Sequence, residues 1–160
     1  SGSMESDALQ ALVRRLNPDN QPGRLALIHR LGAARVQEEL PRLIKTVRDT
    51  GIGVVWICDP MHGNTVATED GLKTRRFENI AGELETAIAI HRAEDSILGG
   101  VHLELTGEHV TECTGGPRSL TDTDLRRDYR STVDPRLNYD QAMEIAMLIA
   151  GHGPADLQTS

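Results

Sequence analysis

The amino-acid sequence predicts an α/β fold in which parallel strands are connected by helices. Segments with helical periodicity alternate with short apolar segments, in the order helix and then strand–helix three times. This order is typical of a parallel sheet with crossover helices. The strand segments are continuous apolar runs, as in sheets that are buried on both faces. The length of 160 residues favours one domain with a substantial core.

Two helices and two strands are expected in the first half of the chain. Leu9, Val13 and Leu16 recur at helical spacing, and Pro18 and Pro22–Gly23 end that helix. The next two apolar segments are short and bounded by glycine, which favours strands, and an apolar stripe marks the helix between them. The expected ranges are 7–16 for the first helix, 24–30 for the first strand, 33–50 for the second helix and 54–58 for the second strand.

The second half predicts two more helices and one more strand. A polar loop is expected over 59–75, and Gly99–Gly100 is expected to break the chain before the third strand. The polar stretch 106–138 has little periodicity. The expected ranges are 77–93 (helix), 101–105 (strand) and 139–149 (helix). The predicted organisation is a tag remnant at 1–3, one domain over 4–150 and a flexible tail over 151–160.

Composition excludes several classes of function. The net charge of -7 disfavours nucleic-acid binding, which needs a basic face. No run approaches the ~20 apolar residues of a transmembrane helix, so no membrane association is expected. One Trp, two Tyr and one Phe imply an aliphatic core without a stacking platform for nucleic-acid bases. Two cysteines cannot form a disulfide framework, so the cytoplasm is the expected compartment.

Ionisable residues collect where the predicted strands end, which is where parallel α/β folds place their chemistry. Arg30 follows the first strand, and an arginine there suits a phosphate or a carboxylate. His62 follows the second strand, and Glu104 lies in the expected third strand, where it shares a face with His102. Together with Asp134, these histidine and carboxylate side chains are ligand types for a divalent cation.

Structural interpretations stand beside these functional ones. A lone histidine such as His62 is more often hydrogen-bonded than bound to metal, and Asp134 before a proline is ordinarily a turn former. Cys58 is most simply a small core residue. The basic cluster 73–76 is usually a solvated face, but beside a phosphate site it could steer an anion. Glu104 is harder to explain structurally, because an unpaired buried carboxylate is costly. The residues alone therefore indicate an anion- and metal-binding α/β protein.

Six sequence runs, in register over about residues 17–150, resemble the class II family of 3-deoxy-D-arabino-heptulosonate 7-phosphate (DAHP) synthases. Their order and spacing match the family, which makes the resemblance specific. The runs are PGRLALIHR (22–30), CDPMHGNT (58–65), LKTR (72–75), GGVHLELTGE (99–108), VTEC (110–113) and DPRLN (134–138).

The resemblance implies a fold, a reaction and a set of site residues. Members of this family are (β/α)8 barrels of the TIM type. They condense phosphoenolpyruvate with erythrose 4-phosphate at the start of the shikimate pathway, which leads to aromatic amino acids. This transferase reaction uses a divalent metal, commonly manganese or cobalt, with zinc or iron as further candidates. By motif matching, the metal-binding and catalytic residues are His62, Glu104 and Asp134, and the substrate-binding residues are Arg30, Lys73 and Arg75.

The chain also departs from the family pattern. Members are far longer, and the resemblance covers only their C-terminal part, about the last three parallel βα units of the barrel. The family's metal-binding cysteine has no counterpart here, because Cys58 and Cys113 match other family cysteines. A partial barrel leaves open sheet edges, so we expect completion by association, through a homo-oligomer or a complementing barrel-half chain. The alternative is a catalytically silent or repurposed metal-binding, anion-binding or regulatory module.

Overall fold

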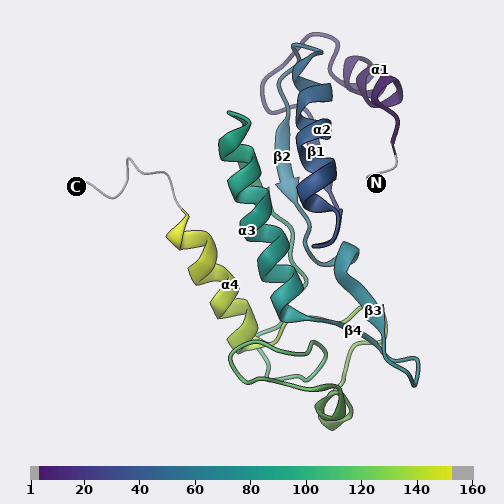
Figure 1. Cartoon of the computed structure of the whole chain (residues 1–160), viewed down its shortest axis with the longest axis vertical. Coiled ribbons are helices and arrows are strands. Elements are labelled where there is room, and N and C mark those ends of the chain that lie inside the picture. The colour runs from purple at the N-terminus through teal and green to yellow at the C-terminus, as the bar shows by residue number, and fades with distance from the viewer. Residues whose placement is uncertain (1–3, 153–160) are drawn as a thin grey trace, which may run out of the picture. The chain divides into compact units, whose positions relative to one another are not determined.

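A computed structural model describes residues 4–152, which form two compact units (Figure 1). The first unit comprises the described residues of Ser1–Gly63 together with Gly82–Leu103, and the second comprises Asn64–Ala81 and the described residues of Glu104–Ser160. The tag remnant expected at 1–3 and most of the expected tail, 153–160, lie outside the described residues. No helix in the described part of the chain is long and apolar enough to cross a membrane.

The first unit contains a three-stranded parallel sheet, which confirms the predicted α/β class. The sheet order is β1-β2-β5, and both strand pairs are parallel. Helices α1 and α2 and the part of α3 that follows Ala81 complete this unit. The bounds are Ser6–Leu16 for α1, Ala26–His29 for β1, Val36–Arg48 for α2, Val55–Cys58 for β2, Phe77–Ala93 for α3 and Leu98–Val101 for β5.

Within residues 4–152, one face of this sheet is buried and the other is partly exposed. His29, Trp56 and Cys58 lie on the buried face, with exposed fractions of 4%, 6% and 0%. Ile28 alternates with His29 along β1, and 46% of its surface is exposed. The expectation that the strands are buried on both faces is therefore wrong for this chain. Apolar residues in a strand indicate that its side chains favour burial. They do not indicate which part of the structure covers each face of the sheet.

The third strand lies earlier than the sequence pattern predicts. It spans Leu98–Val101 rather than 101–105, so Gly99 is inside the strand instead of breaking the chain before it. A side chain at Gly99 would lie 2.8 Å from a methyl carbon of Val55, and the pairing with β2 shifts register at this point. Glycine is used here for close strand approach. Because Glu104 follows the strand, it does not share a strand face with His102, contrary to the prediction.

The second unit contains a short antiparallel hairpin in the segment predicted to be a loop. Strands β3, Thr65–Ala67, and β4, Lys73–Arg75, pair with each other. Short 3-10 helices span His62–Asn64 and Asp122–Arg127. Three-residue strands carry too little periodicity to be recognised from sequence.

Helix α4 closes the described part of the chain. It spans Tyr139–Gly151 and therefore continues into the first residue of the predicted tail. Its start is well defined, because Asn138 and Gln141 form a capping box in which each side chain accepts a backbone N–H of the other residue. The predicted ranges of α3 and of the start of α4 agree with the structure.

Candidate functional site

A buried carboxylate organises the end of β2 in the first unit. Asp59 follows the strand and has no exposed surface. Its carboxylate accepts Nε–H of Arg30 at 2.7 Å and contacts Nδ1 of His62 at 2.8 Å. The same carboxylate accepts the backbone N–H groups of Met61 and His62 at 3.1 and 3.2 Å. One side chain therefore positions two residues that the sequence assigned to substrate and metal binding.

This arrangement suits His62 for metal binding. With Nδ1 on Asp59, Nε2 would be the coordinating atom if the ring bound a metal, as in the carboxylate–histidine–metal arrangement of many metal sites. The close packing of Gly63 adds to the positioning, because a Cβ at Gly63 would lie 2.4 Å from the backbone nitrogen of Gly32. No larger residue fits at Gly63 unless the backbone moves. His102 belongs to the same neighbourhood, with its ring centroid 6.1 Å from that of His62.

Arg30 is held at one atom and open at the others. Its side chain is 47% exposed although Nε is fixed on Asp59. A guanidinium oriented in this way can present its terminal nitrogens to an anion, and arginine matches the geometry of phosphate and carboxylate oxygens. The contact with Asp59 keeps the guanidinium at the strand end, and about half of the side chain stays exposed to solvent.

In the second unit, Arg75 connects the segments that carry the two candidate carboxylate ligands. Its side chain is fully buried, and Nη1 donates both to the carboxylate of Glu104 and to the backbone carbonyl of Pro135. Nε donates to Oγ1 of Thr65 at 2.9 Å. Nη2 is buried and has no hydrogen-bond partner among the described residues. Arg75 therefore positions Glu104 and retains one donor that an anionic ligand could use.

Lys73 and Asp134 form an ion pair in the same unit. Nζ of Lys73 lies 3.0 Å from Oδ1 of Asp134, and the two side chains are 57% and 31% exposed. A partly exposed pair of this kind contributes little to stability, so an incoming cation or anion could displace one member at low cost. The carboxylate of Asp134 and the ammonium of Lys73 are thus both accessible to ligands.

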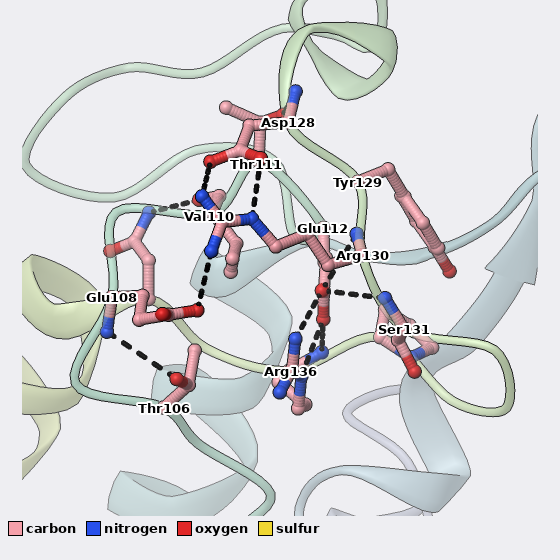
Figure 2. Close-up of polar contacts among 12 residues, drawn as sticks. Thr106, Glu108, Val110, Thr111, Glu112, Asp128, Tyr129, Arg130, Ser131 and Arg136 are labelled. Carbon is pink, nitrogen blue, oxygen red and sulfur yellow. Dashed lines mark hydrogen bonds and ion pairs between the residues drawn. The ribbon is translucent and has the colours of Figure 1, made fainter.

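A second buried carboxylate, Glu112, holds the segment that contains Asp134 (Figure 2). It accepts the backbone N–H groups of Arg130 and Ser131 at 3.2 and 2.9 Å. It also accepts three N–H groups of Arg136, one from the backbone and two from the guanidinium, at 2.7–3.0 Å. Glu112 therefore grips the chain on both sides of Asp134.

The charge of Glu112 is stabilised by this network. Burial alone would raise the pKa of its carboxyl, but the hydrogen bonds from Arg136 and from the backbone N–H groups hold the pKa below its usual value. Inside the segment, Oγ of Ser131 donates to the backbone carbonyl of Asp134 at 2.6 Å. The position of Asp134 thus depends on hydrogen bonds made by its own backbone and by the residues before and after it.

The structure groups the predicted site residues into two local sets. Arg30 and His62 meet at Asp59 in the first unit, whereas Lys73, Arg75, Glu104 and Asp134 are connected in the second. The joint metal site of His62, Glu104 and Asp134 stays a prediction.

Sequence reasoning missed the roles of Asp59 and Glu112. In the sequence, Asp59 directly follows a buried strand and Glu112 lies between Thr111 and Cys113. Neither position indicates which groups the carboxylate binds in the folded chain.

Comparison with known proteins identifies related sequences over nearly the whole chain. Residues 1–150 match the class-II DAHP synthetase family. A phospho-2-dehydro-3-deoxyheptonate aldolase of Neurospora crassa is 49% identical over 152 residues, which cover 94% of this chain and 32% of that protein. The phospho-2-dehydro-3-deoxyheptonate aldolase AroG of Mycolicibacterium smegmatis is 47% identical over 138 residues, covering 86% of this chain and 30% of that protein. The chain spans about one third of the length of these relatives.

Proposed function

This chain belongs to the class-II DAHP synthetase family, and on this premise we propose that it supplies part of a DAHP synthase active site. The reaction would be the aldol-type condensation of phosphoenolpyruvate with erythrose 4-phosphate. The observation that carries the proposal is the buried carboxylate of Asp59, which positions both Arg30 and His62 at the end of β2. An arginine and a histidine held on one carboxylate suit the binding of an anion and a metal next to each other.

The donor set fits a divalent metal. His62 has its Nδ1 on a carboxylate, and Glu104 and Asp134 offer carboxylate oxygens, so the set combines ligand types that manganese, cobalt, iron and zinc accept. We propose that these three residues hold the metal, with manganese or cobalt favoured by the family. A bound metal would supply Lewis acidity toward the aldehyde oxygen of erythrose 4-phosphate. The thiolate ligand of the family would come from a complementing segment.

The cationic residues of the chain would hold the anionic substrates. Arg30 is oriented by Asp59 and open to solvent, which suits the phosphate of phosphoenolpyruvate. Arg75 has a buried Nη2 without a partner in the described part of the chain, and Lys73 forms only a partly exposed ion pair. These groups would offset the repulsion between two phosphorylated substrates and bring the reacting carbons together.

We further propose that the barrel is completed by another barrel-half chain. The apolar residue Ile28 is 46% exposed on the uncovered sheet face, and the chain matches 32% and 30% of its relatives' lengths. Self-association would cover the same face but would not supply the family's cysteine. A complementing barrel half would supply both the remaining strands and the cysteine ligand of the family, and we propose the cytoplasm as the compartment.

Complementation tests this function. The chain is mixed with a polypeptide that carries the remaining barrel strands of a relative, and phosphoenolpyruvate consumption is followed with erythrose 4-phosphate and manganese. We expect turnover from the mixture and little or none from either chain alone, because loss of one preorganised contact costs about a hundredfold or more in rate.

A pair of matched variants tests the role of Glu104 in this turnover. Glu104→Gln should abolish the turnover of the mixture, whereas Glu69→Gln, at an exposed position of the β3–β4 turn, should leave it unchanged. If the two chains associate in a stable complex that binds manganese but shows no turnover, the synthase function is refuted and a silent or repurposed binding module replaces it. Equal turnover in both variants would refute the role of Glu104.

A further inference from the structure

The buried face of the parallel sheet and helix α3 together carry three metal-ligand side chains outside the proposed DAHP synthase site. His29 and Cys58 end β1 and β2 and are paired in register, so they are neighbours on one face of the sheet. Glu83 reaches them from α3. One ligand atom of each residue lies within 4.8 Å of the others. The exposed fractions of the three residues are 4%, 0% and 0%.

Among the residues that the structure describes, His29 finds none of the hydrogen-bond partners that a buried imidazole normally has. Neither of its ring nitrogens has a hydrogen-bond partner within the described part of the chain. The neighbouring ring of His91, 5.8 Å away between centroids, also has a buried Nε2 for which the described residues provide no partner. Buried polar atoms are nearly always satisfied, because leaving them unpaired costs free energy. A bound cation that accepts the lone pair of His29 would remove this cost.

The chemistry of the three groups suits a cation of charge +2. Burial lowers the pKa of His29 to about 4, so its imidazole is neutral at pH 7 and can act as a ligand. Glu83 accepts the backbone N–H groups of Leu31 and Gly32 at 3.2 and 3.0 Å, and these bonds stabilise its anion. A divalent ion together with one thiolate and one carboxylate has no net charge, which lowers the cost of burying the ion.

We propose that His29, Cys58 and Glu83 form a zinc site of three protein ligands that links β1 and β2 to α3. Nitrogen, sulfur and oxygen ligands in one set match Zn²⁺, whereas Mg²⁺ and Mn²⁺ prefer oxygen-rich sites. Burial also raises the pKa of the Cys58 thiol, so the metal displaces the thiol proton, which passes to solvent as the Zn–S bond forms. The site lies within one structural unit and stabilises the packing of α3 on the sheet.

In this chain by itself, the zinc site can be told apart from the proposed catalytic metal site by its sulfur ligand. The candidate set His62, Glu104 and Asp134 has only nitrogen and oxygen ligands. When Co²⁺ is used as a spectroscopic substitute, only a thiolate ligand gives an intense sulfur-to-cobalt charge-transfer band in the near ultraviolet. The band therefore reports on Cys58 even if the DAHP synthase function is wrong, and its absence leaves that function untouched.

The test is a titration of the full chain with Co²⁺ under anaerobic, thiol-free reducing conditions. We expect the band to saturate at one equivalent in the wild type and to disappear when Zn²⁺ is added. Cys58→Ser and His29→Ala should abolish it. Cys113→Ser, which alters the other buried cysteine, in the second unit, should retain it. Circular dichroism establishes that each variant is folded.

A thermal unfolding measurement supplements the cobalt titration. Zn²⁺ should raise the unfolding temperature of the wild type and of Cys113→Ser in comparison with the chelator-treated proteins. The absence of a thiolate–cobalt band in the folded wild-type chain would overturn the proposal. A band that survives in Cys58→Ser and is lost in Cys113→Ser would overturn it as well.

Discussion

Replacing Glu112 with glutamine should destabilise the second unit by about 3 kcal/mol, the lower end of the cost of breaking a buried ion pair. Glu112 has no exposed surface and accepts five N–H groups. Glutamine has the same size but keeps only one acceptor oxygen. Its NH2 group would face donors that the other oxygen now accepts. The value lies at the lower end because the Arg136 side chain is 32% exposed, so water can replace part of the lost contact.

Urea denaturation of the full chain, followed by circular dichroism, measures this loss. Glu108→Gln is the matched control, because it makes the same chemical change in the same network (Figure 2). The Glu108 side chain is 56% exposed and pairs with an arginine that is 52% exposed, so its loss should cost less than about 0.5 kcal/mol.

Equal destabilisation by the two substitutions would refute the reasoning. It would mean that burial of Glu112 does not make its ion pair and hydrogen bonds more important than those of an exposed glutamate. A small loss in Glu112→Gln with an unchanged structure would have the same meaning. In that case the segment that carries Asp134 would have to be held by its other contacts, such as the donation from Ser131.

Three further predictions follow from the first unit. Asp59→Asn should weaken manganese binding about 10- to 100-fold, because the carboxylate that orients His62 is lost. An unchanged affinity in a calorimetric titration would contradict this prediction. Gly99→Ala should destabilise the chain, because the new methyl would lie 2.8 Å from a valine side chain of β2. The control Gly82→Ala should be neutral or stabilising, because no atom lies within 4 Å of its new methyl. Equal urea midpoints for the two variants would exclude the clash. Burial lowers the pKa of His29 and His91 to about 4, so below the ordinary value of 6.5 the unfolded chain binds protons that the folded chain does not. The metal-free protein should therefore keep its full stability above pH 6.5 and lose up to about 3 kcal/mol for each ring as the pH falls to 4, and a flat profile by urea denaturation would refute this.

The sequence by itself determined the elements whose local pattern is strong. The α/β class and the first two strands follow from the alternation of helical and apolar segments, and the structure places these strands in a parallel sheet. Helix α3 was predicted at Phe77–Ala93, where the structure has it. These features depend on side-chain periodicity and on breakers close in the sequence, so they can be read without knowledge of distant residues.

The candidate site residues near the strand ends could also be predicted from the sequence. The motif match pointed to Arg30 and His62, and the structure places both on the carboxylate of Asp59. Their expected roles came from the family resemblance, because a residue type at a strand end does not specify its ligand. The sequence therefore identified candidates for the site but not the group that positions them.

Only the tertiary structure decided the contacts between segments that are distant in the chain. The sequence pattern predicts a break at Gly99, but Gly99 lies inside β5, where β2 passes too close for a side chain. Glu112 binds backbone groups 18 to 24 residues away, and Glu83 binds groups more than 50 residues away. Whether a buried carboxylate or imidazole is satisfied depends on partners that folding brings together, and no local sequence pattern encodes them.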